Sequence, residues 1–303
     1  AMGVGGEWAV ASTLVAEVFP KKARAHVGGI FHASSVLGSY LAVAAGTFLI
    51  GNTAVHTWAA SSEMHWVSSF MDPLSLPWRL GFALGVLPAL LIIWIRKSLR
   101  EPDSWIAARQ QTAENPEQKM GSIGDLFKGA LLRSTLIGVT LSTIGLATFW
   151  GTHIYGKDVF RNAVEQKILA VNIAVESFTP ISIEVETTIL KQHSASLKRS
   201  EMLGMFMVTT GGGIGLLCFG PISQRRGRRA AFLFFHVGGL ISALLLFLVP
   251  LGVSSLYVIL PVFGFLTLGM HAGYAIYFPE LYPPRLRATG TGFCFNSGRI
   301  IAA

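Results

Sequence analysis

The chain has 303 residues, of which 51% are hydrophobic and only 13% are charged, against roughly 25% charged residues in soluble domains. Its mean hydropathy of +0.54 excludes a water-soluble globular domain and indicates a bilayer protein. The net charge of +8 arises from short basic runs between apolar segments, so it favours membrane orientation over nucleic-acid binding.

Eight runs are apolar and long enough to enter a bilayer, which needs about 20 residues per helix. In chain order they are 2–19, 28–50, 78–95, 132–151, 202–222, 230–250, 256–278 and 289–303. The chain ends cut the first and last runs, so we expect a fragment of a longer protein. Cys218 and Cys294 both lie inside such runs and are interpreted as small hydrophobic residues, so neither a metal nor another cofactor is expected.

A polar stretch separates the third run from the fourth. It covers 97–131, contains Pro102 and Pro116, and carries most of the mid-chain charges. We expect it to be a cytoplasmic linker between a partial N-terminal transmembrane half, 1–96, and a partial C-terminal half, 132–303.

A second unusual stretch, 157–197, follows the fourth run. Its acids and lysines are spaced among isoleucine, valine and alanine at helical intervals, which predicts a helical insertion. Pro180 and the β-branched residues after it interrupt this pattern and favour a partly ordered loop to the same extent.

Lysines and arginines divide unevenly between the two sides of the predicted helices. Sixteen of the 24 fall on one side, while on the other side 51–77 has none and 152–200 has six. Short loops follow the positive-inside rule well and long ones poorly. The side with sixteen is therefore predicted to be cytoplasmic and the 157–197 insertion exoplasmic.

A short cassette occurs twice, with every residue displaced by 263 positions. Its members are Glu17, Pro20, Arg24, Ala25 and Gly29 in the first copy and Glu280, Pro283, Arg287, Ala288 and Gly292 in the second. Each copy closes one apolar run and opens the next. The repeat predicts an all-α polytopic membrane fold with two pseudo-symmetric helical halves, an architecture found mostly in transporters.

The stretch GPISQRRGRR, 220–229, resembles the cytoplasmic loop signature of the major facilitator superfamily, Gly-x-x-x-Asp-Arg-x-Gly-Arg-Arg, with Gln224 in place of the acid. The duplicated cassette is similar to the family's corners between helices 4 and 5 and between helices 10 and 11. This resemblance assigns the eight runs to helices 4–11 of twelve and implies a partial major facilitator fold.

Two further motifs, GGEW at 5–8 and LREP at 99–102 before Trp105, resemble the metabolite:proton symporter and sialate or carboxylate branches of that family. Drug:proton antiporters of the superfamily carry a Gly-Pro motif in the fifth helix, whereas 29–46 contains no proline. This difference disfavours a proton-coupled efflux antiporter, which stays as an alternative.

Five polar residues are predicted to lie within the membrane, where each needs a partner, water or a task. They are Glu7, His32, His271, Asn296 and Arg299. Arg299 could bind a substrate carboxylate or pair with an acid elsewhere in the protein. Glu7 could couple protons or orient substrate, or make a packing hydrogen bond. The histidines and the amide could be structural or could line the substrate or proton pathway.

A second group of residues is expected to gate the cytoplasmic side. Glu280 should meet an arginine of the basic loop, and Glu17 its counterpart in a loop between helices 2 and 3. The group comprises Glu17, Arg24, Gly220, Arg225, Arg228, Arg229, Glu280 and Arg287. Plain topological anchoring explains the arginines, but it does not explain acids at helix C-termini, which the helix dipole disfavours.

These features predict a secondary active transporter of a small organic solute, a carboxylate or sugar-like metabolite, working as a proton-coupled symporter by alternating access. We expect a monomer in the plasma (inner) membrane, with the small-molecule substrate, the proton and the lipid bilayer as its partners and no nucleic acid. A nucleotide-driven motor is disfavoured because no Walker-type string occurs. An intramembrane enzyme and a transporter-derived sensor remain as alternatives from other classes.

Overall fold

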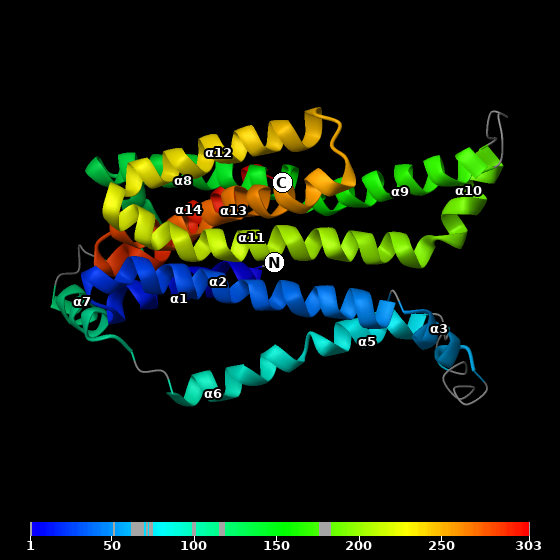
Figure 1. Cartoon of the computed structure of the whole chain (residues 1–303). Coiled ribbons are helices and arrows are strands. Elements are labelled where there is room, and N and C mark those ends of the chain that lie inside the picture. The colour runs from blue at the N-terminus through cyan, green and yellow to red at the C-terminus, as the bar shows by residue number, and fades with distance from the viewer. Residues whose placement is uncertain are drawn as a thin grey trace.

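A computed structural model describes residues 2–50, 52–61, 70, 72, 75–98, 101–114, 119–175 and 183–302, and every element in these ranges is a helix. Most of the long helices run side by side along one direction (Figure 1). Leu99 and Pro180 lie outside the described residues, as does part of the predicted 51–77 loop.

The N-terminal part contains two long helices followed by shorter pieces. Its elements are α1 (Met2–Val18), α2 (Lys21–Ala45), the π-turn η1 (Gly46–Ile50), α3 (Thr53–Ala59), α5 (Leu76–Leu84), the 3-10 turn η4 (Leu87–Leu90) and α6 (Leu91–Ser98). Pro20 ends α1 and precedes the first residue of α2, where its fixed φ is compatible with a helix start.

The middle of the chain has a short linker and a long, bent helical segment. Its elements are α7 (Asp103–Glu114), η5 (Ile123–Phe127), α8 (Gly129–Gly151), η6 (His153–Tyr155), α9 (Gly156–Val175) and α10 (Ile183–Gln192). The described residues of the 157–197 stretch are therefore helical, and α9 continues α8 beyond a single 3-10 turn.

The C-terminal part supplies the most buried helices. Its elements are α11 (Ser194–Arg226), α12 (Arg228–Leu248), α13 (Val253–Tyr277), η7 (Phe278–Leu281), η8 (Pro284–Leu286) and α14 (Arg287–Ala302). Gly227 separates α11 from α12 with a φ of 85°, a left-handed conformation that glycine adopts without strain.

Five described segments are continuous, long and apolar enough to cross a membrane. They are Lys21–Ile50, Gly129–Asn172, Ser194–Arg226, Arg228–Leu248 and Val253–Leu281. The helices α1 and α14 have 17 and 16 residues, slightly fewer than the ~20 that a span needs. The third predicted run is broken between α5 and α6, where Pro88 in η4 removes a backbone donor.

Helix α11 lies at the centre of the packed helices. It approaches α13 so closely that a methyl group at Gly215 would meet the Phe265 carbonyl, and one at Gly264 would meet the carbonyl of Val208. Small residues of this kind let helix backbones come together where lipid provides no hydrophobic drive for association. On its other side α11 packs along α2, with Gly213 facing Val36.

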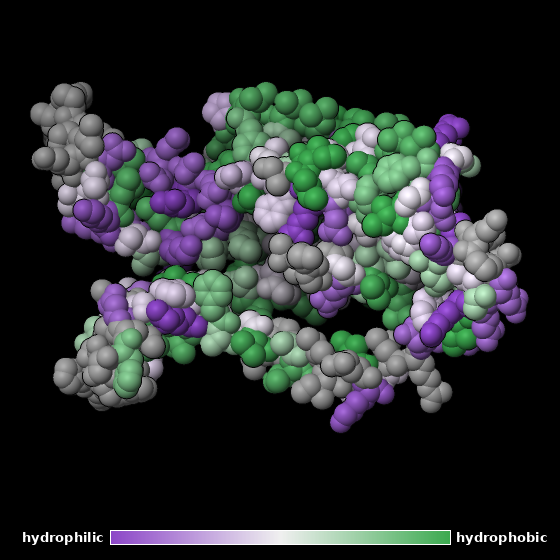
Figure 2. All heavy atoms as spheres, turned by 180° about the vertical axis from the view of Figure 1, so that it is seen from behind, coloured by the Kyte–Doolittle hydropathy of each residue, from purple (hydrophilic) through white to green (hydrophobic). Residues whose placement is uncertain are grey.

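The surface agrees with a lipid environment. On α12, Leu233, Leu240 and Leu248 are 66%, 61% and 73% exposed, and such apolar surface is suited to acyl chains. Figure 2 shows hydrophobic residues across the middle of the molecule and hydrophilic residues gathered toward its two ends. The all-α fold of a multi-pass membrane protein, predicted from the apolar runs, is confirmed.

Candidate functional site

The arginine-rich end, defined by residues 17–24, 224–229 and 280–287, is held by ion pairs. Arg228 binds Glu280 through two nitrogens, Nη2 at 2.8 Å and Nε at 3.3 Å, and donates a third bond from Nη1 to the Ser223 hydroxyl at 2.7 Å. A bidentate pair of this kind fixes orientation as well as distance. The pair joins the start of α12 to the 3-10 turn after α13.

A second ion pair joins the two copies of the cassette. Arg287 Nη1 lies 3.1 Å from Glu17 Oε1, and the Glu17 side chain is only 3% exposed. Arg287 also donates from Nε to the Pro279 carbonyl at 3.0 Å. Glu17 thus has a cation partner at the start of α14, in addition to the loop partner that we expect from the sequence.

The repeat does not reproduce this pair at its second position. Displacement by 263 residues maps Glu17–Arg287 onto Glu280 and Arg24, yet Glu280 binds Arg228, and Arg24 donates to the Phe19 carbonyl at 2.8 Å. Glu17 and Glu280 are equivalent in the repeat, but their cation partners are not. Of these two ion pairs, only Glu17–Arg287 links the halves.

Helices α2 and α11 meet at the same end of the molecule. A methyl group at Gly220 would strike the Ala25 carbonyl, and one at Gly29 would lie 2.9 Å from the carbonyl of Leu216. Gln224, at the position of the missing acid, donates to the Lys22 carbonyl at 2.6 Å. The substituted side chain thus makes a neutral bond between the halves.

The segment before α8 is tied to this end by Asp125. Its carboxylate accepts bonds from Arg285 at 2.8 Å and Lys128 at 2.9 Å. The hydrogen bond from Arg285, followed by that from Lys128, lowers the pKa of Asp125 from its ordinary 3.8 to about 2. Arg225 and Arg229 are exposed, and neither makes an ion pair within the described ranges.

Four ring side chains meet in the middle of the molecule and form an aromatic quartet, Trp8, His32, His271 and Phe295. Trp8 stacks on Phe295 with ring centroids 3.9 Å apart and donates from Nε1 to His32 Nδ1 at 3.2 Å. His32 and His271 lie 6.3 Å apart with nearly parallel rings. The 263-residue displacement maps Trp8 onto His271 and His32 onto Phe295, so one stacked pair is the repeat of the other.

His271 is the most enclosed polar member of the quartet. It is 4% exposed, and neither ring nitrogen makes a well-formed hydrogen bond to another described residue. The hydroxyl of Tyr274, whose ring lies 5.4 Å away, is likewise buried without a hydrogen-bond partner in the described part of the chain. Unpaired buried polar groups are costly, so this place suits a bound water, proton or ligand.

A third histidine, which the sequence analysis did not single out, extends this line. His153 in η6 is buried, and its Nδ1 lies 2.7 Å from the Thr267 hydroxyl. Phe149 stacks on His153 at 5.1 Å and contacts His271 at 5.5 Å. Its position just beyond the end of the fourth apolar run was the available signal.

A cavity of about 370 Å³ opens beside His153, between α2 and the helices of the C-terminal part. Its polar lining comprises Ser35 and Ser39 of α2, His153, Lys157 of α9 and Thr209 of α11. The Lys157 ammonium bonds to Glu201 at 2.8 Å and to Asp158 at 3.1 Å. Mostly apolar walls with a few convergent polar groups are usual for small-molecule sites of 300–1,000 Å³.

None of the five predicted pathway residues is among those that line this cavity. Asn296 donates to the Gly292 carbonyl at 2.9 Å within α14, while Glu7 is exposed on α1. Arg299 is partly buried and makes no ion pair with a described residue. No three His, Cys, Asp or Glu side chains of the described ranges gather as metal ligands would.

Comparison with known proteins gives relatives of moderate similarity. A probable 4-methylmuconolactone transporter of Cupriavidus pinatubonensis is 26% identical over 302 residues, which are 100% of this chain and 58% of the relative. The cis,cis-muconate transport protein of Acinetobacter baylyi is 24% identical over 100% of this chain and 60% of its own length. The sialic acid transporter NanX of Escherichia coli is 24% identical over 98% and 58%.

The chain therefore spans about three-fifths of the length of these curated relatives. No solved structure matches it significantly. The profile of one family, described as the Major Facilitator Superfamily, matches residues 1–303. With this match over its whole length, the chain belongs to the Major Facilitator Superfamily.

Proposed function

We propose that the protein is a secondary active transporter that imports a small organic acid together with protons by alternating access. The observation that carries the proposal is the cavity between α2 and the C-terminal helices. Its polar groups are three hydroxyls, one imidazole and one ammonium among apolar side chains, a set that can bind a carboxylate and leave a short carbon skeleton in contact with apolar walls.

The relatives support this substrate class, because their names specify a muconolactone, cis,cis-muconate and sialic acid. All three are small, oxygen-rich organic acids. A cation favours the binding of such molecules, and Lys157, which also binds Glu201 and Asp158, brings an ammonium group to the cavity.

The remaining predicted roles form part of the same proposal. The halves 1–96 and 132–303 rock against each other, and the Glu17–Arg287 and Arg228–Glu280 pairs stabilise closure at the arginine-rich end. His32, His271 and the newly found His153 carry the coupled proton. Glu7, Asn296 and Arg299 complete the pathway in the assembled transporter, which acts as a monomer in the inner membrane.

Uptake of labelled cis,cis-muconate into proteoliposomes tests the proposal, with the complete reading frame that encodes this chain and an inward proton gradient. Lys157→Gln should raise KM for the dicarboxylate by at least about tenfold, the value of one charge-assisted hydrogen bond. Lys167→Gln, on the exposed side of the same helix, is the matched control. An uptake rate that is the same with and without the proton gradient would refute symport. An unchanged KM in Lys157→Gln would refute the cavity as the acid's binding site.

A further inference from the structure

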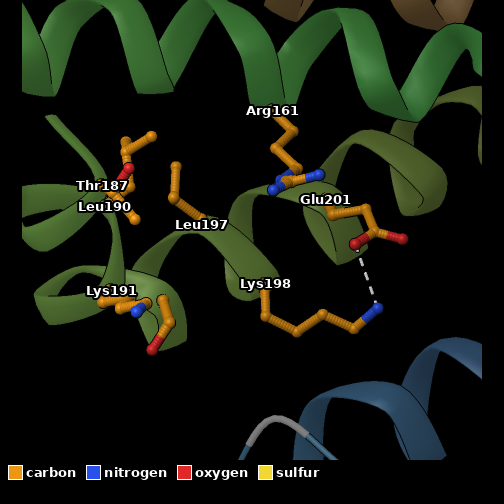
Figure 3. A pocket seen from close by; sticks show the side chains of 8 residues that line it. Arg161, Thr187, Leu190, Lys191, Leu197, Lys198 and Glu201 are labelled. Carbon is orange, nitrogen blue, oxygen red and sulfur yellow. Dashed lines mark hydrogen bonds and ion pairs between the residues drawn. The ribbon is translucent and has the colours of Figure 1, made fainter. Parts of the chain in front are cut away.

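A second cavity, of about 430 Å³, lies between α9, α10 and α11 at the end of the molecule far from α7 (Figures 1 and 3). Three cationic side chains line it, Arg161 from α9, Lys191 from α10 and Lys198 from α11. Thr187 and Ser194 add hydroxyl groups. Such a lining contains the donors that recognise an anion.

Acids only partly balance these charges. Glu201, the one acid in the lining, accepts from Lys198 at 3.0 Å, and Figure 3 shows this bond at one side of the pocket. Arg161 has a distant pairing with Glu165 at 4.0 Å, and its side chain is 43% exposed. Lys191 is exposed and makes no ion pair with any residue that the structure describes. The pocket therefore keeps a positive potential.

The pocket lies where water can reach it. Helix α11 has 33 residues, which corresponds to about 50 Å at 1.5 Å per residue, whereas the hydrocarbon core is about 30 Å thick. Its other end carries Arg225 and Arg226. The first turns of α11, which form part of the pocket, therefore extend beyond the hydrocarbon.

Glu201 connects this pocket, the outer pocket, with the cavity beside His153, the central cavity. One of its oxygens accepts from Lys198, which lines the outer pocket, and the other accepts from Lys157, which lines the central cavity, at 2.8 Å. An anion that binds Lys198 competes with Glu201 for that ammonium group. The carboxylate then keeps only Lys157 of these two partners, so an anion in the pocket alters the Lys157–Glu201 bond.

We propose that the outer pocket is a second binding site, which captures a small organic carboxylate before it enters the central cavity and which communicates with that cavity through Glu201. The proposal rests on the proposed transport function for its ligand class. Its electrostatic basis does not depend on transport.

Thiol labelling tests the site directly. In Ser194→Cys the thiol lies in the pocket, and in Ser196→Cys it lies exposed on the same helix but outside the pocket lining. The probes are an anionic reagent, 2-sulfonatoethyl methanethiosulfonate, and a cationic one, 2-(trimethylammonium)ethyl methanethiosulfonate. Labelling of the unsubstituted protein gives the background from Cys218 and Cys294.

The anionic-to-cationic rate ratio should be about fivefold higher at position 194 than at 196, as expected for an uncompensated positive charge within 10 Å of the thiol. Lys191→Gln or Lys198→Gln should lower the ratio at 194 only. Equal ratios at the two positions would overturn the anion site. Because the reagents report on the surface of the folded protein, each variant is first checked by size-exclusion chromatography for unchanged elution as a monodisperse protein.

Ligand class is tested by protection. cis,cis-Muconate at millimolar concentration should slow labelling at 194 and not at 196, in nanodiscs of phosphatidylcholine. Protection that appears only when phosphatidylglycerol is added would identify a lipid headgroup and overturn the carboxylate proposal, as would an absence of protection. Normal proton-driven uptake without protection counts against the capture site alone, whereas protection without uptake counts against the transport function alone.

Discussion

The Glu17–Arg287 pair gives the sharpest prediction for the arginine-rich end. The two side chains are 3% and 16% exposed, and removal of one partner from a buried ion pair costs about 3–5 kcal/mol. Arg287 keeps its bond to the Pro279 carbonyl and some contact with water. For Glu17→Gln we therefore expect a loss of about 2–3 kcal/mol from the closed arrangement, a shift of roughly 30- to 150-fold toward opening.

Labelling of a cysteine at position 9 measures this shift. Ala9 is 4% exposed and faces Gly292 across the contact between α1 and α14, so Ala9→Cys should be protected from N-ethylmaleimide while these helices are together. Adding Glu17→Gln should raise the labelling rate by at least about thirtyfold, in proportion to the open population. Adding Glu101→Gln, which removes an exposed acid, is the matched control.

Two outcomes decide the question. A labelling rate within about twofold of the parent would show that the pair does not hold α1 against α14 and would refute the reasoning. A charge exchange, Glu17→Arg with Arg287→Glu, should recover part of the protection, because the opposite charges meet again at the same place.

Asp125→Asn should lower the melting temperature of the detergent-solubilised protein by an amount that is constant above about pH 4. The difference should vanish between pH 4 and 2, because the depressed pKa of Asp125 means that its bond to Arg285 stabilises the fold only while the carboxylate is charged. Gly220→Ala should cost about 1–3 kcal/mol, since the methyl group meets helix backbone, whereas Gly38→Ala, with open space around it, should be neutral in the same melting assay. Arg299→Lys should weaken carboxylate uptake more than it lowers expression, because a lysine cannot form the bidentate fork; unchanged uptake kinetics in Arg299→Ala would contradict this role.

The helical architecture could be predicted from the sequence because apolar run length decides it. Seven of the eight predicted runs form continuous helices in the described structure, and five of these meet the length of a membrane span. The exception is 78–95, which we predicted as one continuous helix from its apolar composition. Pro88 lacks a backbone N–H and breaks the helical hydrogen-bond pattern, whatever the hydropathy of its neighbours.

The contacts between the halves were harder to predict. The repeat located Glu17 and Arg287 individually, but it carries no information on which acid binds which cation, and the structure pairs them across the two copies. The sequence carries more information about the aromatic quartet. The displacement of 263 residues maps Trp8 onto His271 and His32 onto Phe295, so the repeat in the sequence relates the two pairs to each other.

The central cavity could not be predicted at all. His153 and Lys157 belong to a segment interpreted as lying at or beyond the membrane surface, and their place beside Ser35 depends on the turn η6, which keeps α9 alongside α11. Gly204 permits that approach, because a methyl group there would lie 3.0 Å from the Lys157 backbone. The hydropathy pattern of a sequence does not indicate a close contact of this kind.

At the arginine-rich end, Gln224 and Arg287 each donate a hydrogen bond to a main-chain oxygen, Gln224 to that of Lys22 and Arg287 to that of Pro279. A carbonyl group is present at every position of a polypeptide, whichever side chain the position carries. Over evolutionary time, positions 22 and 279 can therefore drift while the bonds persist, and only the donors are under selection. Comparisons that search for pairs of positions changing together would pass over these contacts, although the bond from Gln224 to Lys22 joins the two halves.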